Sequence, residues 1–464
     1  MISTQVADLR AQIGAEGRKP QLLFDLSRAL MFEGDLDGAR HCLLAAMRAD
    51  PTLIPKAIHN ENKVFAHLAF EAFGRLHSRA AMLTKPSGLL GMASRDLDPA
   101  KADLISHVLD RAANDWLGGI TPKPDFSGFD IGPDELPVVP LKVLLAAATP
   151  DGPIIDCDYV YHFLHSAMAC GIDMRVMNLF GLLYPSPVPV DRDGLFNALV
   201  GEIESFKPDV ILIDANFSPN DDTITPDHLI RLRSYGMPIT ALISDSDENT
   251  GVPIDFWARH CDLVLAFNRS SLTQALPDYD RLMLWPCFPF TISSDPPHKF
   301  YDIGFIGRLY RGRDVIAHYL DHFGLNPLVV MRGADNQRLP IDDYIRALSS
   351  LRMTFNTGFL LGDYGIVTGR LFEAMLCRTL VLEEIFTPLH PHFVPFVHYV
   401  PVSNAHEAVI YAQYFLAHPE RLTRITNMAY DWVTRHFTPQ KFWAKFASRL
   451  SRLNGKDQKS PDIG

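Results

Sequence analysis

Three apolar runs decide the fold class expected for this chain: DVILID at 209–214, PITALIS at 238–244 and DLVLAF at 262–267. Each run is continuously apolar rather than alternating, a pattern typical of strands buried on both faces of a parallel sheet. Two similar runs precede them, at 142–148 and 172–180. Because the intervals leave room for crossover helices, the pattern predicts a doubly wound α/β domain over residues 141–290.

The alternation of apolar runs and helical stretches restarts after a polar, proline-bearing break at 291–299. The strands expected in this second half lie at 301–307, 327–333, 352–358 and 379–384. They predict a second α/β domain over residues 300–437. A final helix over 438–454, with Thr438 as its N-cap residue, is expected to cross back onto the first domain, and residues 455–464 form a frayed tail.

The N-terminal residues 1–115 read as helices, with few strand-like runs. Residues 20–51 resemble a single tetratricopeptide repeat, which must pack on neighbouring helices because one unit cannot bury its own apolar face. The segment is either a partner-binding surface or a helical cap that adds packing to the next domain. Residues 116–140 are dense in glycine and proline and predict a linker.

Composition excludes several classes of protein. Of the 464 residues, 47% are hydrophobic and 21% are charged, so most of the chain is expected to be globular. The net charge of −11 gives no global basic field for nucleic acid. No apolar run reaches the roughly 20 residues that span a bilayer, and no secretory signal precedes the helices, although peripheral contact with a membrane stays open. The six cysteines form no CxxC pair and indicate reduced thiols of a cytoplasmic protein.

A phosphate-binding turn is expected after the first strand of the second domain, in GFIGRLYRGRD at 304–314. Gly307 lets the backbone approach a phosphate, and the N-terminus of the following helix offers free N–H groups. Arg308, Arg311 and Arg313 supply guanidinium groups that suit the oxygens of a diphosphate. A glycine turn with three arginines favours phosphate binding over the alternative, a solvated basic loop that caps a strand.

The segment TGRLFEAMLCRTLVLEE at 368–384 is the second candidate element. Gly369 leaves backbone N–H groups exposed at the start of a helix, behind Thr368 as N-cap residue. Arg370 and Glu373 share one helical face because they are three residues apart. This carboxylate can accept both hydroxyls of a ribose, and the arginine can meet a phosphate. Taken alone, the same spacing fits an ordinary intrahelical ion pair better.

These two elements, with FLAHPERLTRITNMAYDWVTRHFT at 415–438, carry a resemblance to the GT-B glycosyltransferases over about residues 142–450. Within that class the chain is most similar to the group 1 branch that includes the CgeB-like spore proteins. The resemblance implies two Rossmann-like domains that face a cleft. The second would hold a nucleotide-diphosphate sugar and the first an acceptor.

Carried over by position, Arg308 and Arg313 would lie on the diphosphate, Gly369 would approach the donor and Glu373 would bind the ribose. The resemblance also implies that no cofactor and no bound metal serve the diphosphate, because arginines and a helix dipole do so. Two positions depart from the family. Gly365 replaces the first of two glutamates spaced eight residues apart, which leaves a retaining or an inverting outcome open, and Arg378 stands where the family usually has glycine.

The first domain offers candidates for a catalytic base. The run ending at 244 is followed by Asp245, Asp247 and Glu248, and an inverting enzyme needs a base there to deprotonate an acceptor hydroxyl. Asp245 is our first choice, with an N-cap or loop hydrogen bond as its alternative role. Further candidates are Asp151, Asp156, His162 and Asp214. No metal site is predicted, because no cysteine or carboxylate completes a set with His390, His392 and His398 at the usual spacing.

The leading hypothesis is transfer of a sugar from a nucleotide-diphosphate donor to a protein or glycan acceptor, with no nucleic acid as partner. One alternative is a non-catalytic scaffold that docks a partner through its helical segment, and another is a sugar-nucleotide epimerase or related enzyme. Arg308, Arg313, Arg370 and Glu373 favour the transferase. The missing first glutamate and Arg378 favour the scaffold.

Overall fold

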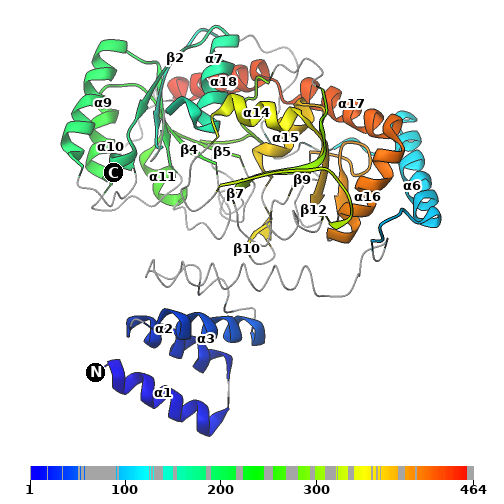
Figure 1. Ribbon diagram of the computed structural model, residues 1–464. Helices are drawn as coiled ribbons and strands as arrows, with labels where there is room; N and C mark the ends of the chain where they lie inside the picture. Colours follow the sequence, from blue (N-terminus) through cyan, green and yellow to red (C-terminus); the bar gives the residue numbers. More distant parts are fainter. Residues whose placement is uncertain are drawn as a thin grey trace.

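The computed structural model contains two parallel sheets with helices packed around them, and a separate group of helices at the N-terminus (Figure 1). The described residues are 2–17, 19–33, 35–50, 53, 57, 90, 93–124, 126, 129, 139–149, 154–183, 190–215, 223–244, 254–267, 281–292, 298–308, 320, 322–332, 339–356, 359–361, 364–365, 367–384, 392–402 and 405–456.

The first sheet has six parallel strands in the order β2-β1-β3-β4-β5-β6. Its strands are β1 (Lys142–Ala147), β2 (Asp173–Asn178), β3 (Val210–Asp214), β4 (Ile239–Ile243), β5 (Leu263–Ala266) and β6 (Leu282–Leu284). The helices between them are α7 (Asp158–Ala169), α8 (Phe180–Leu183), α9 (Arg192–Phe206), α10 (Pro226–Arg233) and α11 (Ile254–His260). Strands β3, β4 and β5 are buried throughout, as their continuous apolar runs predict. The sequence pattern missed β6, because three residues are too few to show a period.

The second sheet has five parallel strands in the order β13-β12-β9-β7-β8. Its strands are β7 (Tyr301–Arg308), β8 (Pro327–Arg332), β9 (Leu351–Asn356), β12 (Leu380–Glu384) and β13 (Val400–Val402). A small antiparallel pair, β10 (Phe359–Leu361) and β11 (Tyr364–Gly365), stands outside it. The helices of this half are α14 (Ile341–Ser349), α15 (Gly369–Leu376), α16 (Ala405–Ala417) and α17 (Pro419–His436). The helix expected near 312–323 lies almost wholly outside the described residues.

Both sheets follow the same topology, because the first five strands of each, counted in chain order, lie in the order 2-1-3-4-5. The order reverses between β1 and β3 in the first sheet and between β7 and β9 in the second. Doubly wound sheets bind ligands beyond the carboxyl ends of the strands at such a switch point. Two parallel sheets with helices, preceded by an all-α segment, confirm the predicted fold class. The exact domain boundaries stay predictions.

The last helix, α18 (Pro439–Lys456), returns to the first sheet and packs against α7. The side chain of Thr438 caps its start, because Oγ1 accepts a hydrogen bond from the Lys441 N–H at 3.2 Å. Trp443 is fully buried and donates its indole N–H to Ser166 Oγ of α7 at 3.0 Å. This end of the chain therefore joins the second half of the protein to the first.

The N-terminal helices divide into two groups. Helices α1 (Ile2–Glu16), α2 (Pro20–Phe32) and α3 (Leu36–Ala49) contact one another in sequence order and bury Phe24, Leu43 and Met47 among themselves. Helix α6 (Pro99–Leu117) instead lies beside α16 and α17, where Ile105 and Leu109 join the apolar cluster of those helices (Figure 1). Among the N-terminal helices that the structure describes, α6 therefore contributes to the core of the second half, together with Leu90 from the segment before it.

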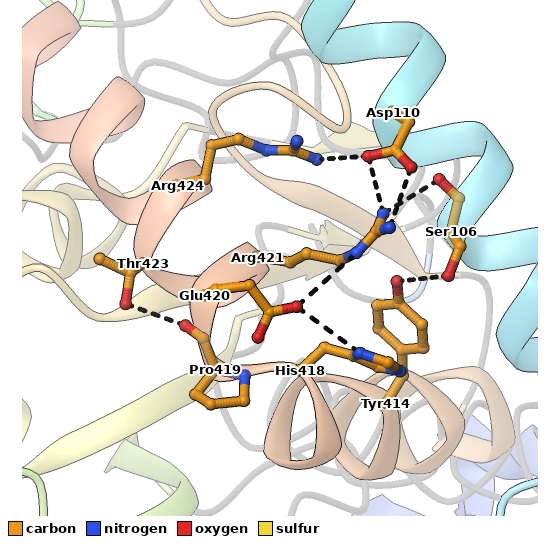
Figure 2. Close-up of polar contacts among 9 residues, drawn as sticks. All are labelled: Ser106, Asp110, Tyr414, His418, Pro419, Glu420, Arg421, Thr423 and Arg424. Carbon is orange, nitrogen blue, oxygen red and sulfur yellow. Dashed lines mark hydrogen bonds and ion pairs between the residues drawn. The ribbon is translucent and has the colours of Figure 1, made fainter.

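Charged groups hold α6 in this position (Figure 2). The Asp110 carboxylate accepts two hydrogen bonds from Arg421, at 2.8 and 2.9 Å, and one from Arg424 at 3.2 Å. Beside it, the hydroxyls of Ser106 and Tyr414 lie 2.8 Å apart. Partial burial alone would raise the pKa of Asp110, but the hydrogen bonds from both arginines outweigh it and lower the pKa. The bidentate geometry fixes the angle at which the helix docks.

The turn between α15 and β12 explains why an arginine can stand where glycine is usual. Arg378 has φ +50°, in the left-handed region that favours glycine. Its guanidinium donates to Asn427 Oδ1 at 2.5 Å and lies 4.1 Å from the centroid of the Tyr430 ring. These contacts offset the backbone strain, so the turn forms without glycine.

Among the described residues, no helix is both long and apolar enough to span a membrane.

Two deletions should separate the roles of the N-terminal helices. Removing residues 1–57 takes away α1–α3 and their own apolar cluster, so the remaining protein should stay soluble and keep its melting temperature within about 2 °C. Removing residues 1–117 also strips α6 and exposes the apolar faces of α16 and α17, so the melting temperature should fall by at least about 5 °C, or the protein should aggregate. Differential scanning calorimetry checks both, and an equal loss in the two variants would contradict the division described here.

Candidate functional site

The strongest candidate site lies at the carboxyl edge of the second sheet, at the switch point between β7 and β9. The end of β7 carries Gly307, the end of β9 carries Asn356, and the neighbouring strand β12 contributes Glu383. Because all the strands of this sheet are parallel, these ends meet at one edge. Helix α15 begins at the same edge and supplies Arg370 from its first turn.

Gly307 makes room for the guanidinium of Arg370. A Cβ atom added to Gly307 would lie 2.6 Å from Arg370 Nη2, so the guanidinium would have to shift, and 3.1 Å from the Phe305 ring, which is a tight contact. The guanidinium carbon lies 4.8 Å from the centroid of the Phe305 ring, within the range of a cation–π contact. The absent side chain and the aromatic ring thus define where this cation sits.

Besides the Phe305 ring, Arg370 contacts the side chain of Asn356 in the described part of the chain. Its Nη1 donates to Asn356 Oδ1 at 3.0 Å, and its Nε has no hydrogen-bond partner among the described residues. Thr368 occupies the N-cap position of α15, but its hydroxyl makes no capping bond to the helix. It accepts instead from Asn356 Nδ2 at 2.9 Å. The first turn of α15 therefore has no side-chain cap and presents its N–H groups beside a guanidinium, a combination that suits an anion.

Glu373 has a different environment from the one expected of a ribose ligand. Its side chain is only 5% exposed. One oxygen accepts from His162 Nε2 at 2.8 Å, and the other accepts from the Tyr344 hydroxyl at 2.5 Å. Burial, together with the neighbouring Glu373, raises the pKa of Tyr344 well above its ordinary value, so this phenol stays protonated and donates. Each oxygen can still accept a second hydrogen bond, so burial rather than a lack of acceptor sites limits the access of a ribose, and the expected contact stays a prediction.

The other predicted site residues either lie close to Arg370 or fall outside what the structure describes. Gly369 sits next to Phe288 and Phe290, and a Cβ there would make ordinary contacts of 3.4 Å or more. Arg308 ends β7, but its side chain is not described, and Arg313 and Asp245 lie outside the described residues. The structure thus brings Gly307 and Arg370 together and leaves the roles of Arg308, Arg313, Gly369 and Asp245 as predictions.

A second polar group marks the switch point of the first sheet. Asp214 ends β3 and is nearly fully buried. Its carboxylate accepts from the Tyr159 hydroxyl at 2.9 Å, and that hydroxyl accepts from the Ala148 N–H, just after β1, at 3.0 Å. Burial, then the nearby Asp214, raises the pKa of Tyr159 well above its ordinary value. These contacts tie the ends of β1 and β3 together, so they give Asp214 a structural role.

Residue types alone did not identify Asn356, Glu383 or Tyr344. The signal that could have found the first two is their place: each is a polar residue at the carboxyl end of a predicted apolar strand, RMTFN or TLVLE. His162 was named only as one candidate base among several, and the structure assigns it to Glu373 instead. Tyr344 carries no local signal, because its partner lies 29 residues away.

His392 and His398 belong to an aromatic cluster, and His390 lies outside the described residues. The ring of His398 stacks on Trp432 and meets Trp116 edge-on, each with centroids 5.0 Å apart. His398 Nδ1 accepts from the Val394 N–H at 3.0 Å. His392 meets the Phe129 ring edge-on at 4.5 Å. In the part of the chain that the structure describes, no group of three or more histidine, cysteine or acidic side chains could hold a metal ion.

Comparisons with known proteins found one family model and several solved structures that resemble this chain. Residues 311–448 match the model of a family described as glycosyl transferase-like. No curated protein matches the sequence. Three solved structures illustrate the structural similarity. One is Anabaena HepE with UDP and glucose (14% identity, 67% of this chain and 100% of that chain, TM-score 0.44). Another is sucrose-phosphate synthase from Thermosynechococcus elongatus (12%, 68% and 100%, 0.42). The third is an α-glucosyltransferase with UDP and DNA (11%, 68% and 100%, 0.48).

The environment of His398 predicts a measurable loss of stability in acid. Burial, and then the nearby His436, lower the pKa of His398 from 6.5 to about 3. Between these values the unfolded chain binds a proton that the folded protein does not, so the free energy of unfolding should fall as the pH drops from about 6.5 towards 3, by up to about 1.4 kcal/mol per pH unit. Urea unfolding at pH 7, 6 and 5 measures this slope.

The matched variants are His398→Phe, which should flatten the slope by about one proton, and His107→Gln on the exposed face of α6, which should leave it unchanged. An unchanged slope in His398→Phe would show that His398 titrates alike in the folded and unfolded states.

Proposed function

We propose that this protein is a glycosyltransferase that takes a sugar from a nucleotide-diphosphate donor. The observation that carries the proposal is the Arg370 guanidinium, held at the switch point of the second sheet within the segment that matches a glycosyl transferase-like family. Departure of the nucleoside diphosphate leaves negative charge on the β-phosphate. A fixed cation and free helix N–H groups at that place stabilise the charge as it develops.

The same proposal extends to the acceptor, to the family relationship and to the cellular compartment. We infer a protein or glycan acceptor, bound beside the first sheet, with Asp245 as the base that removes the proton of its hydroxyl. We also infer a CgeB-like relationship and recruitment of the acceptor by the repeat-like helices α1–α3. None of the six cysteines forms a disulfide bond, which supports a role in the reducing cytoplasm.

Nucleotide binding tests the donor site. Isothermal calorimetry with UDP, GDP, ADP and dTDP should find one ligand that binds the wild-type protein. Arg370→Ala should weaken that binding by about 1.5–3 kcal/mol, roughly 10- to 150-fold, because charged hydrogen bonds to phosphate are lost. Gly307→Ala should act in the same direction, because its methyl group displaces the guanidinium.

Arg111→Ala, which removes an exposed guanidinium from α6, is the matched control and should bind as the wild type does. Transfer or hydrolysis of the matching nucleotide sugars then separates an enzyme from a scaffold. A protein that binds the nucleotide but releases no sugar from any donor would favour the scaffold. Absence of binding to all four nucleotides would refute the proposal.

Metal removal gives a separate prediction. If Arg370 and the start of α15 neutralise the diphosphate, sugar release should keep at least about half of its rate in excess EDTA, since the cations needed are side chains. The measurement compares initial rates with EDTA alone and with EDTA plus saturating Mg²⁺ or Mn²⁺. Complete loss in EDTA, with recovery on adding metal, would show that a divalent ion takes this part.

A further inference from the structure

The amide of Asn356 is held in one orientation by the groups around it. Asn356 is fully buried at the end of β9. Its Nδ2 donates to Glu383 Oε2 at 2.7 Å and to Thr368 Oγ1 at 2.9 Å, while its Oδ1 accepts from Arg370 Nη1 at 3.0 Å. An ionised carboxylate can only accept hydrogen bonds. Glu383 therefore turns the NH₂ group towards itself and the carbonyl oxygen towards the guanidinium.

This chain of contacts keeps two opposite charges apart. Glu383 is fully buried on β12, and Arg370 is partly buried on α15. Among the described residues, the guanidinium donates to the Asn356 carbonyl oxygen and to no carboxylate. A direct pair would neutralise the cation and satisfy its donors. The intervening amide instead passes on the orienting effect of the carboxylate and leaves Nε without a protein partner in the described chain.

We propose that Asn356 and Glu383 are positioning residues for Arg370. Glu383 fixes the orientation of the Asn356 amide, and the amide fixes the position of the Arg370 guanidinium over Phe305 and beside Gly307. The guanidinium then binds the diphosphate of the donor. Neither Asn356 nor Glu383 touches the ligand. The inference rests on the proposed function, because it assigns both residues to the same donor site.

Single substitutions test the specificity of the effect. One probe is the nucleoside diphosphate that binds the wild type in the calorimetric panel. The other is its matching nucleoside, whose binding is measured by its displacement of the diphosphate. Asn356→Ala should weaken diphosphate binding by at least about tenfold, because the guanidinium loses the acceptor that orients it, and should change nucleoside binding by less than about twofold. A general disturbance of the fold would weaken both ligands alike.

A double-mutant cycle tests whether the effect passes through Arg370. In an Arg370→Ala background, Asn356→Ala should weaken diphosphate binding by less than about twofold, because the group it positions is already absent. Additive losses, equal to those of the two single variants, would overturn the proposal.

Two substitutions of Glu383 supply a second test. Glu383→Gln keeps an amide oxygen that can accept from Asn356 Nδ2, so diphosphate binding should stay within about threefold of wild-type affinity. Glu383→Leu removes this acceptor and leaves the amide of Asn356 without its orienting partner, so diphosphate binding should fall by at least about fivefold. Equal affinities of the two variants, with unfolding showing that both proteins are folded, would overturn the proposal. This pair keeps the test decisive if Asn356→Ala does not fold.

The outcomes separate the two levels of inference. If the wild type binds none of the nucleotides, the proposed function and this inference fall together. If the wild type binds one and Arg370→Ala weakens it, but Asn356→Ala binds as tightly as the wild type, only the positioning role is refuted.

Discussion

The contact on which the arrangement of the two sheets depends is the buried carboxylate of Glu373. It lies on α15 of the second half and accepts a hydrogen bond from His162, on α7 of the first. Both side chains are almost completely buried, so separating the halves would leave a carboxylate with one donor removed in an apolar surrounding. Phe290 lies against His162 and Phe372, and completes the surrounding wall. The same helix carries Arg370, so the joint between the sheets and the candidate donor site share one rigid element.

The repeated strand order accounts for where polar residues gather. In each sheet the order reverses next to the first strand, and the loops there leave in opposite directions. The two switch points have been filled differently. In the first, Tyr159 and Asp214 bond to each other and close the space between the strand ends. In the second, Gly307 leaves room for the Arg370 guanidinium and Asn356 binds its Nη1, while its Nε has no hydrogen-bond partner among the residues that the structure describes. One topology thus gives a closed edge and an edge able to receive an anion.

Much of this architecture could be predicted from the sequence, and the failures have physical causes. Continuous apolar runs predict buried parallel strands, so nine of the strands were predicted close to their observed limits. Strands β6 and β13 were missed because they are too short to show a pattern. Gly307 and Arg370 could be found because glycine and arginine carry chemical signals. Asn356 and Glu383 were missed, because a polar residue at the end of a strand is a weak signal and their roles arise from contacts with other elements. The docking of α6 was missed because the arginines that hold it lie 311 and 314 residues further along the chain.

That separation has a consequence for how the protein is made. A ribosome produces α6 long before it produces the helices that cover it, so Ile105 and Leu109 face water while the whole first sheet is being synthesised. Such an apolar helical face is a ready target for a chaperone during translation. The apolar face of α6 becomes buried when α16 and α17 have been synthesised and pack against it. For this chain, the burial of α6 is completed by helices whose docking arginine, Arg421, lies 311 residues further along the sequence.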